Sequence, residues 1–575
     1  MLRNRLMLVA PLLLAACATL PADEQAVATT GSNPGATPAM GVVSAADPRA
    51  VEAGMAMLRQ GGSATDAAIA TMLALSVVEP QSSGIGGGGF YVHSSGKDQI
   101  DTIDGRETAP ATATPARFLG SDGKPLPFPQ AVVSGLSVGV PGNLRLAEEA
   151  HRRNGKLPWA LLFQPAIALA RNGFEITPRL HAALTSAKDR AARDPEGRAL
   201  FFNAAGDPLP VGTLVRNPDQ AVTLRRLSET GAASFYNGSE ASAMAARIAA
   251  ATPQDGQITA ADVSAYQAKD RAPVCGEYRS YRICGMGPPS SGASTVYAIL
   301  KQLERFDLTA LGPQSPTAWH LFAESQRLAY ADRDRYLGDT DFAQVPLSGL
   351  TAPAYLASRG ALISAGSTLS SVAPGRPEGV TLSWATGQGP EEQGTSHFVT
   401  ADKQGNVVSY TSTVEGPFGS GVMFGGFYLN NELTDFSWIP EDDGQPVANR
   451  VEGSKRPRSS MSPTIVYGPD GNIVLAIGAA GGSTIPVQVA KALIGVLDWH
   501  LPAQDAIALP GLYSPGDTIF VEPGSDLLAM QAELEALGHK VEQRAMPFKA
   551  NAAQVVGGRW VGAADPRSEG SWIAE

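Results

Sequence analysis

The sequence predicts one large α+β body, and three observations lead to that prediction. The chain has 575 residues, of which 43% are hydrophobic and 17% charged, a balance typical of a folded protein with a sizeable core. Helical spacing of apolar residues dominates as far as Leu337, whereas alternating strands separated by turns follow from Ser383 onward. No internal repeat relates these segments, so we expect helices and sheets packed into a single unit.

Charge argues against one broad class of function. The formal net charge is -11, and no run of lysines and arginines forms a basic stripe. Binding to a phosphate backbone therefore lacks its electrostatic basis. We expect no nucleic-acid partner, and chemistry on a small molecule or a peptide instead.

The N-terminus has the pattern of a secretory signal. Arg3 and Arg5 precede an apolar stretch at 6–14, which is too short to span a membrane as a mature helix. The ending LAAC at 14–17 resembles a bacterial lipobox, in which Cys17 is lipidated and becomes the mature N-terminus. An ordinary signal peptide with an incidental cysteine is the alternative.

Lipid on Cys17 would hold the protein at a bilayer, since each buried methylene contributes about 0.8 kcal/mol. Residues 18–40 are rich in Ala, Thr, Pro and Gly without apolar periodicity, which predicts a flexible tether. The folded part then begins near Gly41. We expect a membrane-anchored lipoprotein of the bacterial periplasm, and Ala18 after the cysteine favours the outer membrane by analogy.

Helix and strand signals follow one another along the folded part. In chain order we expect helices at 48–59 and 65–77, strands at 90–93 and 99–103, a helix-rich region at 143–250 and a long helix at 318–337. The first two helices form a pair, because Gly61 and Gly62 break the apolar spacing between them and Pro80 ends the second.

A glycine-rich segment at 84–89 joins the second helix to the first strand. Its glycines match G-x-G-x-x-G, the letters of a dinucleotide-binding loop. Such a loop follows a strand and opens a helix, whereas this segment follows a helix and enters a strand. We therefore interpret it as a close backbone crossing and expect no cofactor.

Cys275 and Cys284 flank an alternating, hairpin-like stretch. In an exported chain a disulfide across such a hairpin is the expected pairing, with two unpaired strand cysteines as the alternative. The seven histidines show no H-E-x-x-H and no close pair, so we expect no metal site.

Thr395 stands where a loop delivers the chain to a strand, after Gly394 and before Ser396. A threonine in that position usually serves only the turn and the strand. If the Gly394-Thr395 peptide is cut, however, Thr395 gains an α-amino group that can act as base for its own hydroxyl. One residue then holds both nucleophile and base.

Further motifs, in a fixed order, give that threonine a context. They are VEPQSSG at 78–84, RETAP at 106–110, VGVPG at 138–142, QGTSHF at 393–398, SYTST at 409–413, GSG at 419–421, LNNELTDF at 429–436, KRPRSSMSPT at 455–464, AAGGS at 479–483 and ADPR at 564–567. Together they resemble the γ-glutamyltransferase (γ-glutamyltranspeptidase) family over essentially the whole mature chain.

The resemblance implies a fold and a maturation step. The fold would be the four-layer αββα sandwich of N-terminal nucleophile hydrolases. The precursor would cut itself before Thr395, which leaves a large subunit, 41–394, and a small catalytic subunit, 395–575, interleaved in one domain. Substrates would be glutathione and other γ-glutamyl compounds, and the acyl group would pass to water or to an acceptor amino acid or peptide.

The resemblance also implies the role of each site residue. Thr395 is the nucleophile, Thr413 orients it, and the backbone amides of Gly481 and Gly482 form the oxyanion hole. Arg106 clasps the substrate's α-carboxylate through two parallel hydrogen bonds, with the hydroxyls of Ser459 and Ser460 completing that site. The α-ammonium lies against Glu432 and Asp435.

Three departures from the family's pattern bear on specificity. Glu415 stands near the ammonium where many members have an asparagine, so a further carboxylate faces the cation. The stretch 437–454 is shorter than the lid that covers the pocket in some members. Ala480 and Thr484 replace a proline and an arginine beside the glycine pair, which changes the local rigidity of that loop.

Two other functions stay open from the sequence. A glutaryl-type β-lactam acylase shares the fold and the self-processing, but that group commonly has a serine nucleophile and no ammonium to bind. Thr395, Glu432 and Asp435 argue against it. From a different class, an unprocessed envelope lipoprotein would keep the fold only for binding or scaffolding.

Overall fold

The computed structural model describes residues 41–97, 99–253, 256–381, 384–387 and 394–575. The predicted signal sequence, Cys17 and the predicted tether at 18–40 lie outside these residues. In the part of the chain that is described, no helix combines the length and the apolar character needed to cross a bilayer. The described residues from Gly41 to Glu575 form one compact unit.

The first of two large sheets has seven strands, all paired antiparallel. Across the sheet they run β22 (Ser571–Ala574), β1 (Gly41–Ala45), β9 (Ser396–Asp402), β10 (Val407–Thr413), β2 (Gly88–Gly96), β3 (Gln99–Gly105) and β6 (Lys269–Asp270). Every residue of β9 and β10 is buried. The two strands that follow the predicted cut are therefore central and covered on both faces.

The second sheet has six strands, again antiparallel. Their order is β21 (Arg559–Ala564), β20 (Lys549–Val556), β16 (Ile473–Ala480), β15 (Thr464–Tyr467), β8 (Tyr281–Gly285) and β7 (Val274–Tyr278). Strands β16 and β20 contact β9 across the interface between the sheets. The two sheets thus pack face to face.

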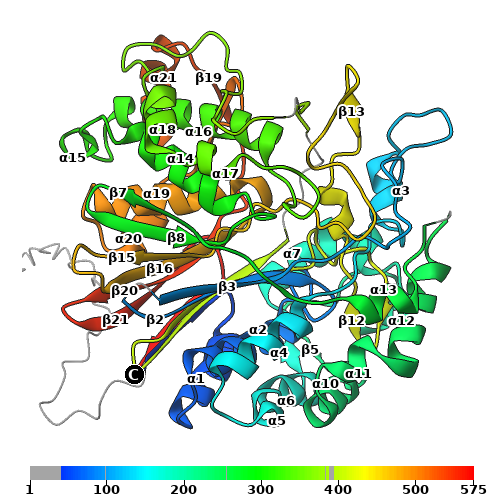
Figure 1. Cartoon of the computed structure of the whole chain (residues 1–575). Helices are drawn as coiled ribbons and strands as arrows, with labels where there is room; N and C mark the ends of the chain where they lie inside the picture. The colour runs from blue at the N-terminus through cyan, green and yellow to red at the C-terminus, as the bar shows by residue number, and fades with distance from the viewer. Residues whose placement is uncertain (1–40, 98, 254–255, 382–383, 388–393) are drawn as a thin grey trace, which may run out of the picture. The chain divides into compact units, whose positions relative to one another are not determined.

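Helices cover both outer faces and complete the four-layer αββα sandwich that the resemblance implies (Figure 1). The first sheet is covered by α1 (Pro48–Arg59), α2 (Ala64–Val78) and α4 (Asn143–Asn154). The second is covered by α14 (Gly292–Leu303), α19 (Ile485–Leu497) and α20 (Ala503–Ala508), with α16 (Pro316–Tyr336) packed on α14. One apolar core lies on each side of the first sheet.

Most of the expected elements are present, with boundaries shifted by a few residues. Helix α1 spans 48–59 as predicted, and α2 begins one residue before Thr65 because Ser63 and Asp66 form a reciprocal capping box. The strand expected at 90–93 extends to nine residues in β2. The interpretation of the glycine segment as a backbone crossing is confirmed: a Cβ on Gly87 would lie 1.9 Å from the carbonyl oxygen of Thr413.

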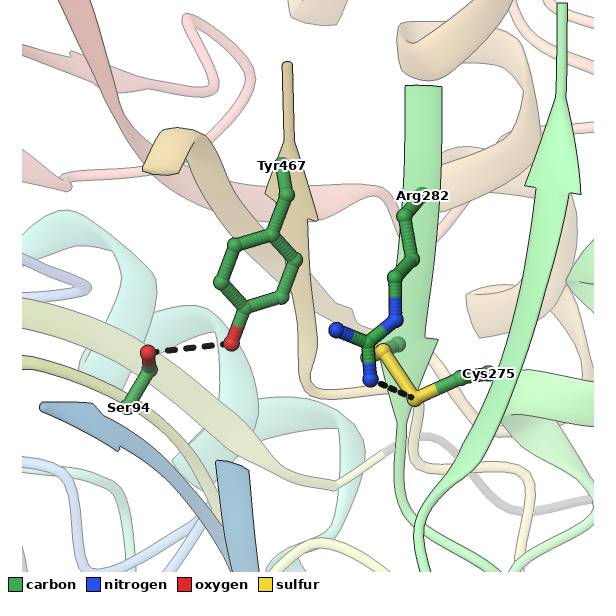
Figure 2. Close-up of a disulfide and its surroundings, with 5 residues drawn as sticks. Ser94, Cys275, Arg282 and Tyr467 are labelled. Carbon is green, nitrogen blue, oxygen red and sulfur yellow. Dashed lines mark hydrogen bonds between the residues drawn. A yellow bond between two sulfur atoms is a disulfide. The ribbon is translucent and has the colours of Figure 1, made fainter. Parts of the chain in front are cut away.

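Cys275 and Cys284 face each other in the β7–β8 hairpin and form a disulfide (Figure 2). A guanidinium N–H of Arg282 donates to Cys275 Sγ at 3.7 Å, and the same guanidinium lies over the ring of Tyr467. The Tyr467 hydroxyl donates to Ser94 Oγ at 2.9 Å, which ties the second sheet to β2 of the first. The disulfide is thus connected, through Arg282 and Tyr467, to the interface between the two sheets.

Candidate active site

Thr395 lies directly before β9, and the antiparallel pairing of β9 with β10 brings Thr413 beside it. Thr395 is buried, and its hydroxyl donates to Thr413 Oγ1 at 3.1 Å. Thr413 Oγ1 also accepts the backbone N–H of Glu415 at 2.8 Å. Since Glu415 N–H fixes the Thr413 oxygen, that oxygen can hold the Thr395 hydroxyl in one orientation.

The junction before Thr395 is crowded and strained. Thr395 has φ 139°, a region that β-branched residues avoid and that costs on the order of 1–3 kcal/mol. A Cβ on Gly394 would lie 2.0 Å from the carbonyl oxygen of Glu415, so only glycine fits there. The φ torsion of Thr395 runs through the Gly394 carbonyl carbon. Cutting that peptide removes the torsion, so the strain favours the cut chain.

Gly481 and Gly482 lie at the end of β16, where the short 3₁₀ helix η2 (Gly482–Thr484) leads into α19. Their φ angles are 127° and 59°, which only glycine adopts readily. The first N–H groups of a helix have no partner within it and carry the positive end of its dipole. Gly482 also lines the cavity that contains Thr395. This is suitable geometry for stabilising an oxyanion.

Gln488 braces the glycine pair. Its amide donates to the carbonyl of Ala480 at 2.7 Å and to Thr484 Oγ1 at 3.1 Å, and its oxygen accepts the N–H of Lys549 at 3.0 Å. The Thr484 hydroxyl in turn donates to the carbonyl of Gly481 at 2.8 Å. Side-chain hydrogen bonds therefore hold the loop in which Ala480 and Thr484 replace the family's proline and arginine.

The start of β9 is held by hydrogen bonds to Glu79, which directly follows α2, and through Glu79 to Lys549 on β20. Ser396 Oγ donates to Glu79 at 2.5 Å, and the Lys549 ammonium donates to the same carboxylate at 2.9 Å. Burial lowers the pKa of the Lys549 ammonium to about 8. His397 points to the opposite face of the strand from Ser396, as the alternation predicts, and contacts Thr411 Oγ1 at 2.8 Å. These bonds fix the backbone next to Thr395.

A cavity of about 300 Å³ opens in front of Thr395. Nine of the residues that the sequence analysis selected line it together: Arg106, Thr395, Thr413, Glu415, Glu432, Asp435, Ser459, Ser460 and Gly482. Ten more line it that were given no role: Tyr330, Arg333, Asp334, Arg458, Met461, Ser483, Ile485, Tyr513, Pro515 and Gly516. Of these, only Arg458, Met461 and Ser483 lie inside a family motif. Cys275 and Cys284 lie away from this cavity, on β7 and β8.

The Arg106 guanidinium is almost completely buried and already occupied. It forms ion pairs with Glu432 and Asp435 and donates to the carbonyls of Pro457 and Arg458 at 3.2 and 3.0 Å. A two-bond clasp of a carboxylate by Arg106 stays a prediction, and it requires Arg106 to exchange some of these partners.

Three carboxylates surround Arg106 on the cavity side. Oxygen atoms of Glu415, Glu432 and Asp435 lie within 4.8 Å of one another. Carboxylate oxygens at this spacing suit an ammonium group and also a hard metal ion. Two of the three are paired with Arg106, so the cluster as it stands is a partly neutralised cation site.

Glu107 belongs to the RETAP motif, where the sequence predicts no role for it, and it is buried next to Glu432 and Arg106. Both of its carboxyl oxygens and one oxygen of Glu432 are buried, and the two carboxyls lie close enough to interact through a shared hydrogen bond. A Cβ on Gly88 would lie 2.4 Å from Glu107 Oε2, so the enclosure is tight. Burial and then the charge of Glu432 raise the pKa of Glu107 well above its ordinary value. Burial therefore favours the neutral form of Glu107.

The chain is similar in sequence to known proteins along nearly its whole length. A model described as Gamma-glutamyltranspeptidase matches residues 50–574. The glutathione hydrolase proenzyme of Bacillus subtilis strain 168 is 37% identical over 512 residues, 87% of this chain and 85% of that protein. Its counterpart from Escherichia coli K12 is 36% identical over 545 residues, 92% and 90% of the two chains. The ACY 1 acylase proenzyme of Pseudomonas sp. strain V22 is 34% identical over 515 residues, 88% of each.

Solved structures give the same likeness in three dimensions. Cephalosporin acylase from Bacillus halodurans superposes with a TM-score of 0.81 at 26% identity, covering 93% of this chain and 95% of that one. Gamma-glutamyltranspeptidase from Helicobacter pylori has a TM-score of 0.55 at 36% identity, covering 58% of this chain and 95% of the solved chain.

Replacing Gly394 by alanine is expected to slow cleavage of the chain by about tenfold or more, because the added methyl must displace the Glu415 carbonyl. The measurement is the fraction of full-length chain over time on denaturing gels. Gly366→Ala is the matched control, since its added methyl meets only Ser364 Oγ at 3.9 Å. Equal cleavage rates in the two variants would show that the junction tolerates the side chain.

Glu432 makes ammonium binding depend on pH. Burial raises its pKa to about 7 against the opposing effect of Arg106, so Glu432 loses its charge as the pH falls through that value. We expect KM for a γ-glutamyl anilide to fall as pH rises from about 6 to 8, and KM for a glutaryl anilide, which has no ammonium, to lack that fall.

Glu107→Gln keeps a neutral donor facing Glu432, so it should preserve this profile, whereas Glu107→Leu should raise KM at every pH. A profile that is the same for both anilides contradicts the assignment.

Proposed function

The chain belongs to the γ-glutamyltranspeptidase family, and from that premise we propose which residues perform its chemistry. It is an enzyme of the γ-glutamyltransferase and glutathione hydrolase type, made as a proenzyme, and it acts on glutathione and other γ-glutamyl compounds. One observation carries the assignment of the site. The Thr395 hydroxyl lies 3.1 Å from Thr413 Oγ1, and Thr395 lines a cavity that also contains the acidic and basic side chains needed to bind a zwitterion.

Maturation begins with attack of Thr395 Oγ1 on the Gly394 carbonyl carbon. The C–N bond breaks, the nitrogen keeps its electron pair and takes up a proton, and an ester joins Gly394 to the Thr395 oxygen. Water then hydrolyses that ester. The products are a carboxylate at Gly394 and a free α-amino group at Thr395, so each step balances without a cofactor.

Turnover follows covalent acyl transfer. Thr395 Oγ1 attacks the γ-carbonyl while the α-amine of Thr395, with an ordinary pKa of about 7.7 to 8.0, takes the hydroxyl proton. The amides of Gly481 and Gly482 stabilise the tetrahedral oxyanion, and loss of one such donor typically costs about 3 to 4 kcal/mol. The leaving amine takes the proton, and water or an acceptor amine releases the γ-glutamyl ester.

Binding depends on holding both charges of the substrate's α-carbon. The ammonium lies against Glu415, Glu432 and Asp435, and the carboxylate lies beside the hydroxyls of Ser459 and Ser460. Arg106 can join them only by releasing one of its present partners. Replacement of asparagine by Glu415 strengthens the attraction for the ammonium. A neutral or anionic acyl group has no ammonium to pair with these carboxylates. A γ-glutamyl donor therefore suits the cavity better than a glutaryl donor.

Acylase activity is the second candidate, because the similar proteins include the ACY 1 acylase and the B. halodurans cephalosporin acylase. The threonine nucleophile and the three carboxylates favour γ-glutamyl chemistry. Rates on γ-glutamyl and glutaryl anilides separate the two, and faster glutaryl cleavage would reverse the choice.

Purified wild-type protein is expected to show two bands on denaturing gels, with a small fragment whose N-terminal sequence begins at Thr395, and to turn over a γ-glutamyl anilide. Thr395→Ala removes the nucleophilic hydroxyl, and the uncut chain never frees the α-amine, so the variant should give one full-length band and no turnover. A fragment that begins elsewhere, or cleavage retained in the variant, would move the nucleophile. A wild type that stays uncut would favour a scaffold role.

We also propose a lipoprotein in the bacterial periplasm, held at the membrane through Cys17, on the strength of the LAAC ending. More than one acyl chain would make the attachment stable. The wild type should fractionate with membranes, and Cys17→Ser should release the enzyme into the soluble fraction with its turnover intact. A wild type found only in the soluble fraction would argue for an ordinary signal peptide.

A further inference from the structure

The carboxylate half of the proposed zwitterion site lacks an available cation at Arg106. That guanidinium makes ion pairs with two carboxylates and donates to two carbonyls, so four acceptors share its five N–H groups. Glu415 adds a third negative group nearby. The surroundings of Arg106 are thus net negative and attract the ammonium more than the carboxylate.

A second guanidinium, that of Arg333, reaches the same cavity from the last turn of α16. It donates to Ser460 Oγ at 2.6 Å and to Ser291 Oγ at 2.9 Å. The Ser291 hydroxyl donates to the carbonyl of Ser459 at 2.7 Å. Arg333 therefore supports both serines of the carboxylate site, one directly and one through Ser291.

These contacts fix the direction in which the serine hydroxyls donate. A hydroxyl has a single proton, and an oxygen that accepts from a cation turns that proton away from it. Ser460 Oγ accepts from Arg333, and Ser459 Oγ accepts the N–H of Met461 at 3.2 Å. Each serine thereby keeps its own proton to donate to an anion in the cavity.

Charge also accumulates on this side. Arg333 and Arg458 share a single carboxylate, Asp334, at 2.7 and 3.1 Å. Burial and the proximity of Arg333 lower the pKa of Arg458 only to about 10, so both arginines are charged at neutral pH. The group of three is net positive and lines the same cavity as the net negative cluster around Arg106.

From this arrangement we propose that Arg333 is a positioning residue for the substrate's α-carboxylate, acting through Ser460 and through its charge. The cavity is then divided: ammonium toward Glu415, Glu432 and Asp435, carboxylate between the two serines and the Arg333 side. The inference rests on the proposed γ-glutamyl function and adds a residue that specifies the carboxylate of the donor.

Three anilides that differ in the charged groups they carry test the role of Arg333. The γ-glutamyl anilide carries both groups, the glutaryl anilide only the carboxylate, and the 4-aminobutyryl anilide only the ammonium. Wild type, Arg333→Gln, Arg333→Lys and Arg335→Gln are compared. Arg335 lies on the same helix turn and outside the cavity lining, so its variant controls for loss of one positive charge on α16.

Arg333→Gln should raise KM for the γ-glutamyl and glutaryl anilides by about 10- to 100-fold, the range for hydrogen bonds to charged groups. Values of kcat should stay within about threefold, and KM for the 4-aminobutyryl anilide should hardly change. Arg333→Lys should recover part of the affinity through its charge, and Arg335→Gln should match the wild type.

Cleavage of the variant into subunits serves as the control that it is folded. In a folded variant, equal loss on all three anilides, or no loss on any, overturns the inference. A wild type that turns over the γ-glutamyl anilide while Arg333→Gln behaves in that way leaves the proposed function standing. A wild type that turns over none of the three would refute the function itself.

Discussion

The pairing of β9 with β10 in the middle of a buried sheet is the constraint on which the site depends. It places Thr413 next to Thr395 and brings the Glu415 carbonyl against Gly394, so one strand register sets both the orientation of the Thr395 hydroxyl and the crowding of the peptide before it. Shifting β9 by one residue would turn Thr395 to the other face. Ser396, Glu79 and Lys549 oppose such a shift, because they bond the start of the strand to α2 and β20.

The cavity in front of this strand pair is electrically divided. Carboxylates gather around Arg106, and arginines gather around Asp334. Isolated buried charges would be costly, yet here Glu432 and Asp435 are paired with Arg106, and Arg333 and Arg458 are paired with Asp334. Under the proposed function, this division favours one orientation of a zwitterion, the one that presents its γ-carbonyl to Thr395.

Much of the fold and part of the site followed from the sequence, and the reasons are physical. Helices α1 and α16 carry caps, proline boundaries and apolar spacing, which are local signals. Thr395, Thr413 and the glycine pair stand in motifs. Arg333 could not be found in this way, because its importance comes from a contact between residues 127 positions apart. The need for glycine at 394 likewise arises from a carbonyl about 20 residues downstream, which local patterns do not reveal.

The interleaving of strands also affects how long the protein stays folded after the proposed cut. Strands β9 and β10, which follow the proposed cut, lie between β1 and β2, which precede it, so the two fragments would share backbone ladders on both sides. Before the cut, folding is unimolecular. Afterwards, fragments that came apart would have to meet again in solution, at a rate that falls with dilution, while their bare strand edges favour aggregation. The lifetime of the mature protein is therefore governed by how slowly it opens, which is kinetic rather than equilibrium stability.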